Sequence, residues 1–286
     1  MMATINSGQF PKRLRQPRLG WIAPCPRLMQ WSIALLIWIS GSGLAPLAQG
    51  EHSVKSVKQT AVARAERSFY EARARLNKNP NDPDVAWHFA RTSFDWADFV
   101  DTDEQRASTA LEGIGACRQA IQKNPKSAPA HYYLALNLGQ LARTRNLGAL
   151  KLVAEMENEF KAAIEVDPRF DYAGPHRSLG LLYRDAPGWP ASIGSRVRAR
   201  SHLQKAVELT PEYPDNWLSF LEACLSAGER TMVQGKLPTV QECLQEARNK
   251  FIGEEWALSW MDWDQRWEKI KAKATFKNTE SPRGKN

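Results

Sequence analysis

Four short Asn-Pro, Asp-Pro or Thr-Pro steps divide this chain at nearly equal intervals. They are Asn79-Pro80, Asn124-Pro125, Asp167-Pro168 and Thr210-Pro211, and their prolines lie 45, 43 and 43 residues apart. Each step is followed by a stretch rich in aromatic residues. A fixed period of about 20–50 residues is typical of arrays of stacked helix pairs. Because such arrays usually bind other molecules, the repeat favours a binding role over catalysis.

Helical periodicity is clear between the steps. Ala65, Phe69, Ala72 and Leu76 recur at spacings of three and four, as on one face of a helix. Pro83 suits the first turn of a helix, and Thr102 with Gln105 forms a capping box. We therefore expect an all-α chain of about ten helices, near residues 61–76, 83–94, 102–123, 129–136, 147–166, 173–184, 195–209, 215–227, 238–251 and 254–274.

The residues at the third and fourth steps resemble the tetratricopeptide pattern. They are Leu179-Gly180-x-x-Tyr183, then Ala199, Leu203, Ala206 and Pro211, with Trp217 six residues later. The first two repeats depart from the pattern at Arg75 and Cys117. The resemblance implies a tetratricopeptide-like α-solenoid. In such pairs Ala163, Gly180 and Ala206 are the small residues that let the helices approach, so Gly180 should lie at a helix crossing.

Three further segments narrow the resemblance over residues 60–250. Residues 82–91, and Ser127-Ala128-x-Ala130-His131 with Leu138-Gly139, resemble the regulator-of-microtubule-dynamics family. Residues 186–194, with Pro187-Gly188-Trp189-Pro190, resemble the T component of TRAP-type transporters. The first resemblance implies a cytoskeletal role, which an exported chain does not share. The second implies a periplasmic helper protein with transporter subunits as partners.

The ends of the chain differ from its body. Residues 1–50 place five basic residues before the apolar run Trp31–Ile39, and the small-residue site Ala48-Gln49-Gly50 follows. This order is typical of a secretory signal peptide, and an N-terminal anchor is the alternative. We expect this segment to be cleaved and the protein to be periplasmic. If the segment is not cleaved, it is the only part of the chain that we expect to contact the membrane. Residues 51–275 should form the array with a C-terminal capping helix, and 276–286 a disordered tail.

Residues 1–50 carry a net charge of +5 and the tail from Gln265 another +5, so the body between them carries −2 of the total of +8. A nucleic-acid binder normally carries its basic patch on the folded surface, so nucleic acid is excluded as a partner.

Cleavage of the N-terminal segment would leave three cysteines, Cys117, Cys224 and Cys243. Because this number is odd, at least one thiol stays free. Whether Cys224 and Cys243 pair stays open.

No catalytic motif, metal motif or cofactor motif is present, so we expect neither an enzyme nor a bound cofactor. His88, His131 and His176 recur early in successive helix pairs and are better explained as polar groove residues than as metal ligands, since one ion cannot reach them all. An acidic cluster is expected to be a solvated helix end; it comprises Asp95, Asp98, Asp101, Asp103 and Glu104.

The sequence is compatible with two kinds of binding groove. A polar, open groove for a protein or peptide would expose Arg91, His131, Asn137 and Arg177. An enclosed, apolar conduit for a small organic acid or lipid would be lined by Trp87, Tyr132, Tyr133 and Trp189. The first predicts an exported, non-catalytic interaction protein, and the second an accessory component of a TRAP-type transport system. For Trp189 by itself we expect that it folds back to cover the array, and a contact with a partner or ligand at the groove edge is the alternative.

Four tryptophans share one face of the last helix. Trp256, Trp260, Trp263 and Trp267 recur at steps of four, three and four. A terminal helix can cap an array, but tryptophan is also enriched at interface hot spots. We expect Trp256 and Trp260 to be buried and the outer pair to lie nearer the surface. Trp260 and Trp267 are the candidate interface residues if the face binds a partner.

Overall fold

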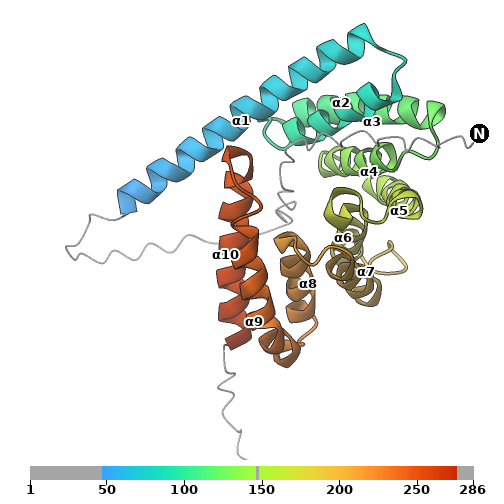
Figure 1. Ribbon diagram of the computed structural model, residues 1–286. Coiled ribbons are helices and arrows are strands. Elements are labelled where there is room, and N and C mark those ends of the chain that lie inside the picture. The colour runs from blue at the N-terminus through green and yellow to red at the C-terminus, as the bar shows by residue number, and fades with distance from the viewer. Residues whose placement is uncertain (1–46, 146–147, 276–286) are drawn as a thin grey trace, which may run out of the picture.

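The computed structural model of the chain describes residues 47–145 and 148–275 (Figure 1). Within them the chain is all-α, and apart from one isolated bridge between Gly188 and Gly194 this part contains no β-structure. Its ten α-helices and one 3-10 helix are α1 (Leu47–Lys78), α2 (Pro83–Ala97), α3 (Asp103–Lys123), α4 (Ala128–Arg143), α5 (Ala149–Val166), α6 (Phe170–Asp185), α7 (Arg196–Leu209), α8 (Pro214–Ser226), α9 (Arg230–Ala247), η1 (Glu254–Trp256) and α10 (Ala257–Thr275).

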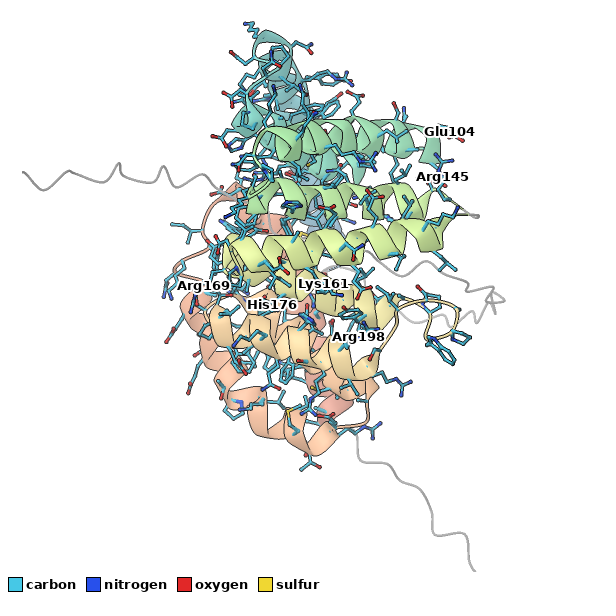
Figure 2. All side chains as sticks on the ribbon, turned by 90° about the vertical axis from the view of Figure 1, so that its right-hand side faces the viewer. Glu104, Arg145, Lys161, Arg169, His176 and Arg198 are labelled. Carbon is cyan, nitrogen blue, oxygen red and sulfur yellow. The ribbon has the colours of Figure 1, made fainter. Side chains whose placement is uncertain are left out.

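Consecutive helices pack as pairs, and the pairs stack into a curved array. Helices α2, α4, α6 and α8 contact one another in order and form the inner layer, while each also packs on its own partner. Helices α3, α5 and α7 form the outer face, which Figure 2 shows with Lys161 and Arg198 labelled. Helix α1 crosses one end of the array, and α10 reaches it from the other end (Figure 1). This contact brings the first and last parts of the described chain together.

Local capping explains where the helices begin. The side chain of Asp82 accepts hydrogen bonds from the backbone N–H groups of Asp84 and Val85, ahead of Pro83. Thr102 and Gln105 form the expected capping box at the start of α3. Such bonds satisfy the N–H groups that the first turn of a helix leaves without partners.

Close helix packing depends on Gly180, where α6 meets α7. A Cβ atom at this position would lie 2.7 Å from Cγ of Leu203. Ala163 and Ala206 are fully buried at equivalent positions on α5 and α7. The small residues predicted from the repeat therefore lie at helix crossings, which confirms that prediction.

Helix α9 begins at Arg230, so the prediction that it starts at Pro238 is wrong. Proline in a helix interior loses one backbone hydrogen bond and costs about 3 kcal/mol. Val233, Val240 and Leu244 on both sides of Pro238 are buried in the second hydrophobic cluster. We attribute the continuous helix to this packing, which outweighs the local penalty.

The three cysteines of the described chain are free thiols. Cys243 lies beside the carbonyl oxygen of Pro211 at 3.3 Å, and Cys224 is buried in the core. A disulfide between Cys224 and Cys243 is therefore not formed, although they lie on consecutive helices.

The C-terminal helix is a packed cap. Trp263 is 0% exposed, and Trp256 and Trp267 are also buried. The Nε1 atom of Trp267 donates to Oε1 of Gln241, while that of Trp260 donates to the carbonyl oxygen of Phe251. The expectation that Trp263 and Trp267 lie nearer the surface is wrong, because α10 packs on α8 and α9 and both side chains are buried there. Trp260 is the most exposed of the four and is only partly buried.

The expected segments 1–50 and 276–286 lie largely or wholly outside the described residues. None of the described helices combines the length and the apolar character that crossing a bilayer requires.

Candidate functional site

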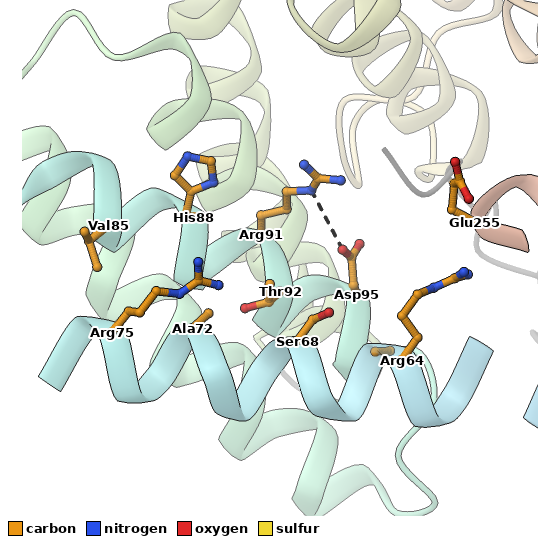
Figure 3. A pocket seen from close by; sticks show the side chains of 11 residues that line it. Arg64, Ser68, Ala72, Arg75, Val85, His88, Arg91, Thr92, Asp95 and Glu255 are labelled. Carbon is orange, nitrogen blue, oxygen red and sulfur yellow. Dashed lines mark ion pairs between the residues drawn. The ribbon is translucent and has the colours of Figure 1, made fainter. Parts of the chain in front are cut away.

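A cavity of about 440 Å³ opens where α1, α2 and η1 meet (Figure 3). Helix α1 contributes Arg64, Ala65, Ser68, Ala72 and Arg75, which share one face because they recur at helical spacing. Helix α2 contributes Val85, His88, Arg91, Thr92 and Asp95, and η1 contributes Glu255. The wall from η1 exists because the C-terminal cap reaches back to α1.

Arg91 and Asp95 form the central charge pair of the cavity. Nε of Arg91 lies 3.9 Å from Oδ2 of Asp95, one helical turn away, and the side chain of Asp95 is 18% exposed. Burial raises the pKa of Asp95 to about 7, although Arg91 opposes the rise. The prediction that Asp95 belongs to a solvated helix end is wrong. Asp98 is also only partly exposed, and it accepts hydrogen bonds from Gln140 and Arg143.

The remaining charges make the cavity basic. Nε and Nη2 of Arg64 are buried, and no group of the described chain accepts a hydrogen bond from them. Burial and the nearby Arg91 lower the pKa of His88, so the imidazole is neutral at pH 7. Three arginines therefore face two carboxylates, those of Asp95 and Glu255.

A strained segment of α6 lies near this cavity. Asp171, Tyr172 and Ala173 have φ values of 51°, 56° and 57°, in the left-handed region that non-glycine residues avoid at a cost of about 1–2 kcal/mol each. Oδ2 of Asp171 accepts a hydrogen bond from the Tyr132 hydroxyl at 3.3 Å. The charge on Asp171 contributes to the raised pKa of Asp95. Strain of this kind persists only where surrounding contacts hold it, and it often marks a functional position.

An aromatic row passes through the strained segment. Ring centroids of Trp87 and Tyr133 lie 6.1 Å apart, and those of Tyr133 and Phe170 lie 6.2 Å apart. Tyr172 then stacks on Tyr213 at 4.6 Å. These residues come from the beginnings of successive inner helices, so the row follows one edge of the inner layer.

Arg177, expected on an open groove, is 1% exposed. Its Nε lies 3.2 Å from Oδ2 of Asp215, and Nη1 of Arg266 lies 2.6 Å from Oδ1 of the same carboxylate. Burial alone would raise the pKa of Asp215, but Arg266 and Arg177 hold it below its ordinary value. The cluster joins α6, α8 and α10, so Arg177 is placed to hold the array together.

His131, Asn137 and Tyr132 are also buried rather than displayed on a groove. Nδ1 of His131 lies 2.5 Å from Oε2 of Glu159, and Nδ2 of Asn137 donates to the carbonyl oxygen of Ala90 at 2.9 Å. Of the expected polar groove residues, His88 and Arg91 line this cavity. The position of each residue in the repeat therefore predicted its helix. It did not predict whether the side chain faces the cavity or the core.

Two other expected residues lie elsewhere. His176 pairs with His202 at an Nδ1–Nδ1 distance of 3.0 Å, in a hollow lined by residues of α6 and α7. Trp189 is 88% exposed, so the expectation that it folds back onto the array is wrong. Its loop is closed by hydrogen bonds from the Gly194 N–H to Pro187 and from the Ser195 N–H to Tyr183.

Several polar residues of the lining were not predicted from the sequence: Arg64, Ser68, Thr92 and Glu255. Asp171, beside the cavity, was not predicted either. Arg64, Ser68 and Arg75 recur at helical spacing, which indicates a polar stripe beside the buried stripe of α1. Nothing local indicates that Glu255, some 190 residues later, faces this stripe.

Comparisons with known proteins identify the fold. No curated protein matches the chain. The family model of regulator of microtubule dynamics proteins 1–3 matches residues 53–181, less than half of the chain. The crystal structure of TTC0263, a thermophilic tetratricopeptide protein of Thermus thermophilus, has a TM-score of 0.51 and 20% identity, covering 76% of this chain and 95% of its own. MamA has a TM-score of 0.40 and 13% identity, covering 80% and 97%.

These likenesses confirm a tetratricopeptide-like α-solenoid that resembles the regulator-of-microtubule-dynamics family. The resemblance to the T component of TRAP-type transporters stays a prediction.

Proposed function

We propose that this chain is a non-catalytic interaction scaffold that binds a protein or peptide segment against its inner layer. The observation that carries the proposal is the cavity between α1, α2 and η1, where polar side chains from three elements converge. A cavity of about 440 Å³ has room for one or two side chains of a partner. The concave faces of solenoids are the surfaces that such proteins commonly use for binding.

The distribution of aromatic residues favours this function over a ligand conduit. A conduit would require Trp87, Tyr132, Tyr133 and Trp189 to line one enclosed space. Tyr132 is buried in the core and Trp189 projects from a loop, and neither belongs to the walls of the cavity. A transport accessory that passes a lipid or organic acid through the array is therefore the weaker alternative.

Two hydroxyl groups, those of Ser68 and Thr92, lie in the walls of the cavity. That of Thr92 donates to the carbonyl oxygen of Phe89 at 2.8 Å. Among the hydrogen bonds of the described residues, neither Ser68 nor Thr92 is paired with a side-chain base, the arrangement that activates such nucleophiles.

The binding role can be tested with substitutions that fill the cavity with a large side chain. Peptides are selected on the wild-type protein from a displayed random library, and their affinities are then measured for Ser68→Trp and Ser201→Trp. Ser68 lines the cavity, whereas Ser201 lines the hollow beside His202 and serves as the matched control. We expect Ser68→Trp to weaken binding at least about tenfold, a change of roughly 1.4 kcal/mol, with little change for Ser201→Trp. Equal affinity for both variants would contradict the proposal.

Export is the second part of the proposal, and it rests on the order of basic, apolar and small residues within 1–50. The exported chain is expected to begin near Glu51 and to be recovered from the periplasmic fraction. Intact-mass measurement and N-terminal sequencing test this directly. A 32.3 kDa chain confined to the cytoplasm would show that the segment does not direct export.

A further inference from the structure

The guanidinium group of Arg64 has an unusual environment within the cavity. Its Nε and Nη2 atoms are buried, and no acceptor of the described chain bonds to them. Removing a charged donor from water without a replacement hydrogen bond is costly. Arg64 therefore has capacity for an anionic partner, and it faces the cavity from α1 (Figure 3).

We propose that this cavity receives a single carboxylate of the bound partner, an acidic side chain or a chain terminus, with Arg64 as its principal ligand. The inference rests on the proposed function, and it specifies the chemistry that the site recognises. Arginine presents a fixed fork of N–H donors that matches the two oxygens of a carboxylate. Ser68 and Thr92 lie in the same walls, and the small side chains of Ala65 and Ala72 leave space between the helices.

The charge of the cavity above about pH 7 favours one negative charge on the ligand. In that range Asp95 is ionised and His88 is neutral, so the three arginines of the lining exceed its two carboxylates by one positive charge. One carboxylate of the ligand neutralises this charge. A phosphate group carries about −2 in the same range and would bring net negative charge into a partly buried space.

Asp95 should couple binding to pH. Its carboxyl titrates near pH 7, because burial raises its pKa to about 7. It faces charged or titratable groups from every element around it: Arg64 from α1, Arg91 and Asp98 from α2, Tyr133 from α4, Asp171 from α6, and Glu255 across the cavity. When Asp95 takes up a proton, one repelling charge is removed, so a carboxylate should bind more tightly at pH 6 than at pH 8.

The experiment uses N-acetylglutamate methylamide as the probe, because it carries one side-chain carboxylate, and its glutamine analogue as the isosteric control. Binding is followed through the Nε–H resonances of arginine in NMR spectra of the full chain. We expect saturable shifts with the glutamate probe alone, and their loss in Arg64→Gln. Arg67→Gln is the matched control, since Arg67 is exposed on the same helix outside the cavity. Circular dichroism confirms that both variants fold.

A second experiment tests the pH dependence by comparing the wild type with the Asp95→Asn variant. Wild type should bind the glutamate probe about fivefold more tightly at pH 6 than at pH 8, the ratio expected for one pKa unit of coupling to a group that titrates near pH 7. Asp95→Asn should bind with the same affinity at both values. A wild-type affinity that is unchanged or weaker at pH 6 would overturn the coupling.

Three results would overturn the carboxylate assignment: equal binding of the glutamine analogue, full binding by Arg64→Gln, or tighter binding of inorganic phosphate than of the glutamate probe. Failure here is distinguishable from failure of the proposed function. If selected peptides are blocked by Ser68→Trp but keep their affinity for Arg64→Gln, the scaffold role stands and the carboxylate assignment falls. If neither substitution affects those peptides, both proposals fall.

Discussion

Asp95 keeps 18% of its side-chain surface exposed, yet its pKa is raised to about 7 because protein surrounds it on several sides. An unfolded aspartate titrates near pH 3.9. The folded pKa is therefore higher than the unfolded one. Asp95 contributes stability that is fully present below about pH 4 and is lost as the pH rises toward 7.

The Asp95→Asn substitution should remove this loss of stability at high pH. At pH 8 the variant should be more stable than the wild type by at most about 4 kcal/mol, the upper limit set by a shift of about three pKa units. The lost attraction to Arg91 reduces the gain. At pH 4 the advantage should disappear, because the wild-type carboxyl is then protonated. Urea unfolding at both pH values measures the difference, and an equal effect at both would contradict the assignment.

Gly180 is the second residue with a testable local role. Alanine would ordinarily stabilise a helix relative to glycine by about 0.5–1 kcal/mol. At Gly180, however, the added Cβ would lie 2.7 Å from Cγ of Leu203, so Gly180→Ala should cost about 1–3 kcal/mol instead. Gly115→Ala is the control, since its Cβ would meet no atom within 4 Å. Opposite signs of the two changes in denaturant midpoint are expected.

At the level of elements, a buried ionic cluster attaches α10 to the array. Asp215 contacts Arg177 of α6 and Arg266 of α10, and Arg266 also contacts Glu222 and Asp262. The packing of the cap is therefore linked to an inner helix two repeats away in sequence.

Asp215→Asn should destabilise the protein by about 3–5 kcal/mol, because it leaves Arg177 buried without its charge partner. Asp264→Asn is the matched control on α10. Its partner Arg248 lies 2.6 Å away, but both side chains are about half exposed, and such pairs contribute about 0–1 kcal/mol. Chemical unfolding of the two variants tests this, and a similar small loss from both would show that the cluster does not hold the cap.

At the scale of the whole molecule, the core divides into two hydrophobic clusters. One extends from α1 to the first part of α7, and the other from α6 to α10. They adjoin where α6 packs on α7. Because each pair in a solenoid contacts mainly its neighbours, damage to one end should weaken that end first.

Trp263→Ala should therefore act regionally. Removing a fully buried tryptophan costs about 3–5 kcal/mol. Amide hydrogen exchange should accelerate across α8, α9 and α10, while α2 to α5 keep most of their protection. Trp189→Ala, which truncates a tryptophan that is 88% exposed, should leave the exchange pattern unchanged. Uniform acceleration along the whole array would indicate a single cooperative unit instead.

Local signals predicted most of the helices. The capping box at Thr102, the proline at the start of α2 and the small residues at the crossings act over three or four residues, so they can be recognised in the chain itself. The same signals failed at Pro238, where burial of the flanking residues outweighs backbone preference. None of them indicated the left-handed conformation of Asp171–Ala173.

The sequence by itself determined the class of fold, the pairing of helices and the period of the array. Only the tertiary structure decided that Arg64, Asp95 and Glu255 share a cavity, and that Arg177, Asn137 and Trp267 are buried. The physical reason is that curvature accumulates from small rotations at every helix interface. No single spacing in the chain encodes their sum, so the meeting of α1 with η1 and α10 follows only from the assembled solenoid.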